Sequence, residues 1–359
     1  MDDLTLARWR VNTLRLSSQT YPSAPAVVSG LLGVQAENYA QASWAVAART
    51  SGMGVDEFDA LFDSGAILRT HVLRPTWHFV SPEDIRWLIE VTVPRIWPSL
   101  AQLQRSLDIS DDALDASSRV ISESLLGNIH LTREAIGERL EDSGLPGNGQ
   151  ALGLALSHAE LSALICSGAL MEGRHTHALL DERAPKARRL DRDGALAELV
   201  LRYFTGHGPA TERDLAYWAS LTVTDVRKGL AQVSDQLGNF DHDGRTFWYG
   251  EPPPPDNAPS PRAHLLQILD EYYRGYQDSR YVLDVAGIVP RGREASTGMV
   301  LVDTQMVGNI WRTVRPDGVR FDFVPFRDLE EDELQAVHEA GDRYGVFLGL
   351  PARVDTRSA

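Results

Sequence analysis

The first residues that could do chemistry together are Gln35 and Glu37, which are separated by one alanine. A carboxylate can take a proton from a water molecule or stabilise a positive charge, and an amide can orient water or a substrate through hydrogen bonds. In a helix residues i and i+2 point about 200° apart, whereas in an extended segment they face the same side. Joint action therefore requires an extended segment. The alternative is a surface pair near the first turn of a helix, where a glutamate is favourable.

A second polar group surrounds the hairpin that alternation predicts at residues 67–72 and 76–80. Its arginines and histidines are suited to phosphate contacts on a hairpin wing. The alternative is that the histidines are packed or exposed strand residues and the arginines pair with acids. No third histidine or carboxylate lies at ligand spacing, so we predict no metal site. The members of this group are Arg69, His71, Arg74 and His78.

Further basic and amide residues lie outside this hairpin. The densest basic run follows Pro185, and it fits either a solvated connector or a phosphate-binding segment. Helices that read bases are expected to carry basic and amide side chains. The basic run contains Lys186, Arg188, Arg189 and Arg192. The predicted helices contribute Asn38 and Gln41 near the N-terminus, and Arg227 and Lys228 in a helix further along the chain.

The composition sets limits on what these residues can do. The chain has 359 residues, a formal net charge of −15 and 43% hydrophobic residues, which is typical of a globular protein of two or three domains. Cys166 is the single cysteine, so an intramolecular disulfide and a cysteine-based zinc site are excluded. The charge repels nucleic acid at long range, so DNA binding would need a locally basic surface.

Neither the apolar runs nor the N-terminus predicts a membrane partner. No apolar stretch approaches the roughly 20 residues that cross a bilayer. The first residues, MDDL, lack the basic and then apolar pattern of a signal peptide. We therefore expect a soluble cytoplasmic protein.

The elements before residue 251 repeat one order, in which helices are followed by a β-hairpin. The third copy is the clearest, because Thr211 with Asp214 and Thr222 with Asp225 have the spacing of capping boxes. The third copy has three helices followed by a hairpin at residues 237–249, which contains an Asp-Gly turn. This order predicts a winged helix-turn-helix.

The other two copies follow the same order less closely. In the second copy we expect helices at 111–126, 132–140 and 150–167, and a hairpin at 169–181. In the first copy we expect helices at 4–17, 26–32, 38–51 and 55–64 before the hairpin.

Four consecutive prolines in the run EPPPPDNAPSPR predict an extended linker. Beyond it we expect a helix at 263–276, strands at 281–285, 299–302, 306–313 and 318–325, a helix at 329–344 and a strand at 346–350. The predicted fold class is mainly α with β-wings: three tandem winged helix-turn-helix modules plus a C-terminal α+β domain. The predicted domains are winged helix 1 (1–108), winged helix 2 (109–192), winged helix 3 (193–250), the linker (251–262) and the C-terminal domain (263–359).

Five stretches resemble the AlkZ/YcaQ-type winged-helix DNA glycosylases, in the same order and over nearly the whole chain. They are LGVQAENYAQ (32–41), LRTHVLRPTWH (68–78), GPATERDLAYW (208–218), LDEYYRGY (269–276) and VLVDTQMVGNIWR (300–312). The resemblance implies three tandem winged helices and a C-terminal β domain that form a concave channel for double-stranded DNA, which is alkylated or crosslinked in the substrate.

The resemblance also bears on the catalytic residues. The characterised members carry Gln-apolar-Gln or Gln-apolar-Asp, and the matching triplet is Gln35-Ala36-Glu37, with an acid one methylene longer than aspartate. It implies that Glu37 acts on a water or on the charged sugar while Gln35 orients water or substrate. Asp270, Glu271 and Asp303 are interpreted as structural.

Two other functions remain open from the residues. One is a non-catalytic winged-helix DNA-binding protein or regulator, and the other is an acidic scaffold for protein contacts. We predict no nucleotide cofactor, because no glycine-rich phosphate loop follows a strand.

Overall fold

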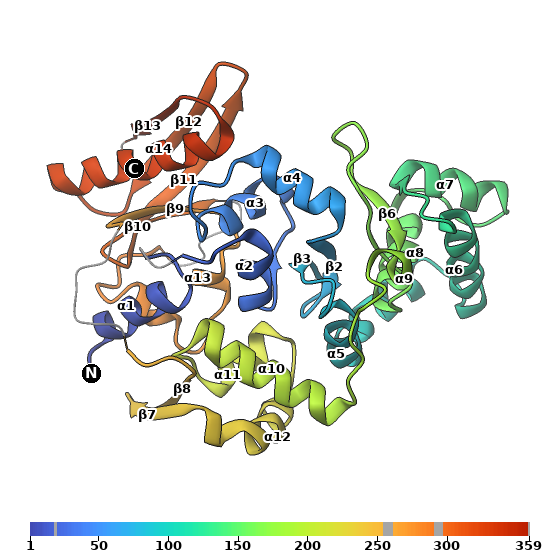
Figure 1. Cartoon of the computed structure of the whole chain (residues 1–359), viewed down its shortest axis with the longest axis horizontal. Coiled ribbons are helices and arrows are strands. Elements are labelled where there is room, and N and C mark those ends of the chain that lie inside the picture. The colour runs from blue at the N-terminus through green and yellow to red at the C-terminus, as the bar shows by residue number, and fades with distance from the viewer. Residues whose placement is uncertain (18–19, 254–260, 291–296, 358–359) are drawn as a thin grey trace.

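The computed structural model describes residues 1–17, 20–253, 261–290 and 297–357. Most of the predicted linker, residues 254–260, lies outside this described part. Within it, the helices up to residue 250 fall into three groups, each with a small antiparallel sheet, and a larger sheet follows (Figure 1). The first group (blue) lies between the C-terminal sheet (orange to red) and the second group (green).

The first group holds the Gln35–Glu37 segment. Its three-stranded sheet has the order β1-β3-β2, and the predicted hairpin is confirmed. Asn38 caps α3 by accepting a hydrogen bond from the main-chain N–H of Gln41 (3.1 Å). The elements are α1 (Asp3–Thr13), α2 (Ala24–Gly30), β1 (Val34–Gln35), α3 (Tyr39–Ala47), α4 (Val55–Ser64), β2 (Leu68–Val72), β3 (Thr76–Val80) and α5 (Ile85–Ser106).

The second group differs from the prediction in two places. The helix expected at 150–167 ends at Leu161, because Ala163 adopts a left-handed conformation (φ 53°) and the chain turns into a buried strand. A short apolar run fits a buried strand as well as a helix. The expected hairpin at 169–181 is also wrong. This range holds one strand, β6, which pairs with β4 and β5, and both of those strands lie before residue 169. The elements are α6 (Asp111–Leu125), β4 (Leu131–Thr132), α7 (Arg133–Asp142), α8 (Gly149–Leu161), β5 (Ile165–Ser167), β6 (Thr176–Leu179) and α9 (Leu180–Arg183).

The third group follows the prediction closely. Both capping boxes, at Thr211 and Thr222, are confirmed. The hairpin turns at Asp243 and Gly244, which both have positive φ, as a tight Asp-Gly turn requires. The elements are α10 (Arg192–His207), α11 (Glu212–Trp218), α12 (Val223–Val233), a 3-10 turn (Ser234–Gln236), β7 (Gly238–His242) and β8 (Arg245–Tyr249).

The C-terminal region is a five-stranded sheet of order β13-β12-β11-β10-β9, antiparallel except for the parallel pair of β12 and β13, and α14 packs on it. Its elements are β9 (Ala263–Leu266), α13 (Glu271–Arg274), a 3-10 turn (Arg280–Leu283), β10 (Gly298–Val302), β11 (Gln305–Arg315), β12 (Gly318–Pro325), α14 (Glu331–Leu348) and β13 (Ala352–Thr356).

Three predictions in this region are wrong. The helix expected at 263–276 begins as a fully buried strand, and only Glu271–Arg274 is helical. The strand expected at 281–285 is mostly a 3-10 turn, and residues 346–348 continue α14. Gly349 (φ 66°) ends that helix, so the last strand starts at Ala352. In each case a short apolar stretch is compatible with both the helical and the strand period, and the packing of neighbouring elements selects the secondary structure.

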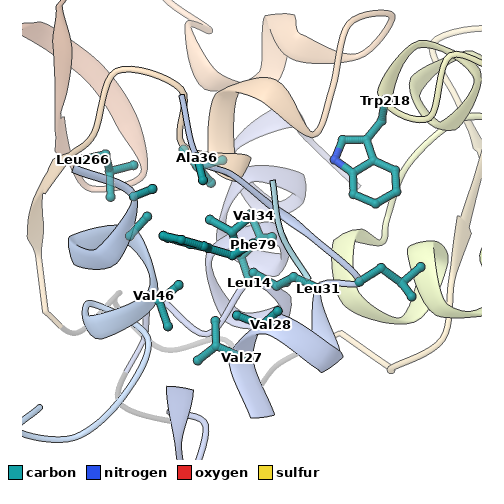
Figure 2. Close-up of a cluster of buried hydrophobic side chains, with 14 of the residues drawn as sticks. Leu14, Val27, Val28, Leu31, Val34, Ala36, Val46, Phe79, Trp218 and Leu266 are labelled. Atoms are coloured by element: carbon teal, nitrogen blue, oxygen red, sulfur yellow. The ribbon is translucent and has the colours of Figure 1, made fainter. Parts of the chain in front are cut away.

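One hydrophobic core runs through the first group, the third group and the C-terminal region, and a second, smaller core lies in the second group around Ile121 and Leu156. Figure 2 shows Val34, Ala36 and Phe79 in the larger core with Trp218 and Leu266. The buried side chains on both sides of Gln35 therefore anchor β1. No helix of the described residues is long and apolar enough to cross a membrane.

Candidate active site

The Gln35–Glu37 segment is extended, as joint action of the two side chains requires. Gln35 pairs with His78 across the antiparallel β1–β3 ladder, and the main-chain N–H of Ala36 donates to the carbonyl of Trp77 (2.7 Å). Helix α3 begins only at Tyr39. Because Ala36 is buried in the core, the flanking side chains point the other way, toward the turn end of the β2–β3 hairpin.

Three contacts fix Gln35, which is 4% exposed. Arg74 donates from Nη2 to Oε1 of Gln35 (2.8 Å), which identifies the amide oxygen. The main-chain N–H of Gln35 donates to Glu271 (3.1 Å), and its carbonyl accepts from Gln267 (3.2 Å). The Nε2 group has no hydrogen-bond partner among the described residues, so its two hydrogens remain available to a ligand.

The Glu37 carboxylate is exposed but held at one oxygen. Its Oε1 accepts a hydrogen bond from the main-chain N–H of Trp77 (2.8 Å), and Oε2 has no partner in the described part of the chain. Arg69 donates to the carbonyls of Ala36 (2.9 Å) and Glu37 (3.3 Å), and its guanidinium lies 4.4 Å from the centre of a Trp77 ring. One carboxylate oxygen is thus oriented and the other is open.

A fully buried carboxylate, that of Glu271, connects this segment to the rest of the chain. Besides Gln35, it accepts hydrogen bonds from Trp218 Nε1 (2.7 Å) and contacts His207 Nε2 (3.3 Å). Burial raises the pKa of Glu271, but the hydrogen bond and charge of His207 and the charge of Arg74 outweigh it and lower the pKa to about 2. Glu271 therefore stays ionised and holds β1 against the third group.

The positions of Arg74 and His78 correct the prediction that they contact phosphates. Arg74 points inward, where Nη1 donates to the carbonyl of Trp218 (2.7 Å) and Nη2 lies 3.3 Å from His78 Nε2. His78 is fully buried, and burial followed by the charge of Arg74 lowers its pKa to about 3, so the ring is neutral. His78 is therefore withdrawn from the surface, and the half-buried Arg74 uses its donors on Gln35 and Trp218.

Arg69 and His71 instead line a pocket of about 590 Å³ between the β2–β3 hairpin and helix α8. Glu160, which is 2% exposed, accepts hydrogen bonds from the main-chain N–H (3.1 Å) and the ring Nδ1 of His71. Its other oxygen lies 3.5 Å from His177 Nδ1. Burial raises the pKa of Glu160, but the charges of these histidines and the His71 hydrogen bond bring it below the usual value.

The remaining predicted DNA contacts divide into paired and open side chains. Arg188 forms ion pairs with Asp84 (2.5 Å) and Glu198 (2.9 Å), so it is an arginine paired with acidic residues. Arg189 pairs with Glu90, Arg192 with Asp225 and Arg227 with Glu212, all on the surface. Lys186, Lys228 and Asn38 are exposed, and Gln41 accepts from the main-chain N–H of Ile268 (3.4 Å).

Sequence reasoning did not single out Glu160, and it named Glu271 without identifying its partners. Glu271 was interpreted as structural, and its contact with Gln35 spans 236 residues, a pairing that no local pattern reveals. Glu160 lies in helix α8, where most of the other residues are apolar. An isolated acidic residue in such a helix indicates that it is buried together with a polar partner. Among the described residues no group of three or more histidine, cysteine, aspartate or glutamate side chains is placed to hold a metal ion.

The comparisons with known proteins agree with one another. The family model described as "DNA glycosylase AlkZ-like" matches residues 28–347. A curated relative, the interstrand DNA cross-link repair glycosylase of Streptomyces sahachiroi, is 24% identical over 96% of this chain and 97% of its own length. The solved structure of the Streptomyces sahachiroi DNA glycosylase AlkZ superimposes with a TM-score of 0.81, at 21% identity and with both chains covered completely.

Proposed function

Because the chain belongs to the AlkZ-like DNA glycosylase family, we propose that it is a DNA repair enzyme that hydrolyses the N-glycosidic bond of alkylated bases in double-stranded DNA. The observation that carries this proposal is the Glu37 carboxylate, with one oxygen held by Trp77 N–H and the other open, on the same side of the extended segment as the unpaired amide Nε2 of Gln35. The curated relative is named for cross-link repair, so crosslinked bases belong among the substrates to be tested.

In the proposed reaction the bond between C1′ and the base nitrogen breaks, and its electron pair goes to the base. An alkylated purine carries a positive charge, so this departure neutralises it. The sugar becomes positively charged, and Glu37 stabilises that charge. A water molecule then bonds to C1′ and gives its proton to the open Oε2 of Glu37.

Gln35 has a positioning part in this scheme. Arg74 donates to its Oε1, and the N–H groups of its Nε2 donate to the attacking water or to the sugar. The rigid β1–β3 pairing and the buried Glu271 keep this amide in place. Precise placement has large effects, since a shift on the order of 1 Å can reduce a rate about a hundredfold.

We further propose that the three groups of helices with their small sheets are winged helix-turn-helix modules, with the domain boundaries predicted from the sequence. The basic and amide side chains that are at least partly exposed contact DNA, and the strongly negative net charge confines binding to the surface that carries them. The proposed contacts are Asn38, Gln41, Arg69, His71, Lys186, Arg189, Arg227 and Lys228. The protein needs no nucleotide cofactor for hydrolysis, and we place it in the cytoplasm.

The test is an assay of base release from duplexes that carry a 7-alkylguanine or an interstrand crosslink. Glu37→Gln keeps the acceptor for Trp77 N–H and removes the negative charge, so release should fall about a hundredfold or more while DNA affinity is retained. Glu123→Gln, an exposed residue of α6, is the matched control and should keep the wild-type rate.

Two outcomes would contradict the proposal. One is equal release by the wild type and Glu37→Gln. The other is salt-sensitive DNA binding by the wild type without release of any base, which would identify a non-catalytic DNA-binding protein or regulator. Absence of DNA binding even at low salt would favour a protein scaffold.

A further inference from the structure

Two arginines near the candidate active site have no carboxylate partner. Arg274 is the last residue of α13, and Arg280 begins the 3-10 turn that follows it. Neither forms an ion pair among the described residues, and both are partly exposed. The DNA contacts proposed from the sequence do not include them. In a chain with a net charge of −15, arginines without carboxylate partners provide a locally basic surface.

The side chain of Tyr217, on α11, contacts both arginines. Arg274 donates from Nη1 to Tyr217 Oη (3.1 Å), and the Arg280 guanidinium lies 5.8 Å from the centre of the Tyr217 ring. Burial raises the pKa of Tyr217, but the charges of Arg274 and Arg280 outweigh it and lower the pKa below its usual value. The electrostatic potential at the phenol oxygen is therefore positive, and it favours an anion there.

The three side chains retain hydrogen-bond donors for a ligand. Arg274 Nη2 and Arg280 Nη1 have no hydrogen-bond partner in the described part of the chain. Since Tyr217 Oη accepts from Arg274, its own O–H group remains to be donated. Arg280 is held in place by its Nε, which donates to the main-chain carbonyls of Tyr273 (3.1 Å) and Tyr276 (2.9 Å). Guanidinium groups of fixed orientation suit the oxygens of a phosphate.

Arg74 connects this cluster to the candidate active site. Its guanidinium lies 5.9 Å from the centre of the Tyr217 ring, and its Nη2 donates to Gln35 Oε1 (2.8 Å). An anion at Tyr217 is therefore separated from the Gln35 amide by one guanidinium group. Each sugar within a DNA strand is flanked by two phosphates, and glycosylases rotate the target nucleotide about its backbone. A phosphate held at Tyr217 keeps the adjoining sugar near the Gln35–Glu37 segment.

We propose that Arg274, Arg280 and Tyr217 bind one of the two phosphates that flank the altered nucleotide, and thereby hold its sugar at the Gln35–Glu37 segment. The inference rests on the proposed glycosylase function and adds a positioning contact on the substrate strand. It follows from one juxtaposition. Two arginines without carboxylate partners share the phenol of Tyr217, one guanidinium group away from Gln35.

The experiment neutralises single phosphates of a duplex that carries one 7-methylguanine. A methylphosphonate linkage, which has no charge, replaces the phosphate on the 5′ side of this nucleotide, the phosphate on its 3′ side, or a phosphate near the end of the duplex. For equilibrium binding the altered nucleotide has a 2′-fluoro sugar, which withdraws electrons from C1′ and slows loss of the base. Base release is measured in single turnovers on the same duplexes without the fluorine.

One of the two flanking methylphosphonates should weaken binding by the wild type about tenfold, because charge-assisted hydrogen bonds are lost, whereas the one near the duplex end should have little effect. Arg274→Gln and Arg280→Gln should each weaken binding of the unmodified duplex to a similar degree and respond less to that methylphosphonate. Tyr217→Phe, which keeps the ring, should show a smaller loss of the same kind. Arg119→Gln, at an exposed arginine of α6, is the matched control and should behave as the wild type.

The response to methylphosphonate separates a phosphate contact from a structural role. A variant that is only destabilised keeps the wild-type ratio of affinities for the charged and neutral linkages, and thermal unfolding of each variant verifies that it is folded. Equal affinity of the wild type for all linkages, or an undiminished ratio in both folded arginine variants, would overturn the phosphate site. A wild-type protein that shows the linkage effect but releases no base would overturn the glycosylase activity and leave the phosphate site supported.

Discussion

Arg74 donates a hydrogen bond from Nη2 to the Oε1 atom of Gln35 over 2.8 Å, and its Nη1 donates to the carbonyl of Trp218 over 2.7 Å. The guanidinium thus links the hairpin turn, β1 and the end of α11. Planar donors of this kind hold an acceptor in one orientation. The residue that sequence reasoning assigned to a phosphate is occupied in orienting the candidate active-site amide.

Substitution of Arg74 should therefore affect rate more than DNA affinity. Arg74→Met leaves Gln35 without its partner, so base release is expected to fall on the order of a hundredfold, with intermediate activity in Arg74→Lys. The dissociation constant for DNA and its salt dependence should stay close to wild type. A salt slope smaller by about one would instead identify Arg74 as a phosphate contact, and Lys228→Ala is the positive control for that behaviour.

Removing one partner of the buried ion pair of Arg49 and Asp270 is expected to destabilise the fold strongly. Both side chains are fully buried and form two hydrogen bonds, of 2.7 and 3.0 Å, between the turn after α3 and the N-cap residue of α13. Asp270→Asn leaves a buried guanidinium charge without its counterion, so the free energy of unfolding should fall by about 3–5 kcal/mol.

Urea unfolding measures that change. The matched control is Asp355→Asn, whose partner Arg353 is 70% exposed, and it should cost under about 1 kcal/mol. Similar losses in the two variants would contradict the assignment of a buried pair that matters for folding.

The stability of the protein should depend on pH through His264. Burial, followed by the charges of Arg343 and Arg49, lowers the pKa of His264 from 6.5 to about 3. Between these values the unfolded chain binds a proton that the folded chain does not. Stability is therefore complete above pH 6.5 and falls as the pH decreases toward 3, by about 1 kcal/mol per pH unit near pH 5.

His264→Leu removes this proton uptake, so its unfolding free energy should change less steeply than that of the wild type between pH 6.5 and 5. Chemical denaturation at a series of pH values measures the slope. His338→Leu, on an exposed part of α14, is the control. Equal slopes in the wild type and His264→Leu would show that His264 is not responsible.

Two helical glycines should respond to alanine with opposite signs. A Cβ at Gly229 would lie 2.5 Å from Val200 Cγ2 and 2.6 Å from the Leu196 carbonyl, because α12 packs tightly on α10. Gly229→Ala is therefore expected to destabilise by about 1–3 kcal/mol. At Gly153 the space is open, so Gly153→Ala should stabilise by up to about 1 kcal/mol. Melting temperatures that shift in the same direction for both would refute this packing difference.

Local chemistry made a large part of the fold predictable. Thr211 and Thr222 indicate helix starts, because each hydroxyl accepts a hydrogen bond from the otherwise unpaired main-chain N–H three residues later. Asp243-Gly244 indicates a hairpin, because both positions tolerate positive φ. The same reasoning failed at residues 263–266 and 165–167. A short run of apolar residues buries equally well in a strand or a helix, and only the neighbouring strands select one.

For the site, the sequence alone supplied the pair Gln35 and Glu37 and the condition that they lie in an extended segment. Tertiary structure decided what each polar group faces. The side chains of Arg74 and His78 point inward, and Glu271, 236 residues away in sequence, binds the main chain of Gln35. Trp77 contacts Glu37 through its main chain and also lines a pocket. Contacts between distant residues carry no periodicity along the chain, so they exist only once the buried surfaces have come together.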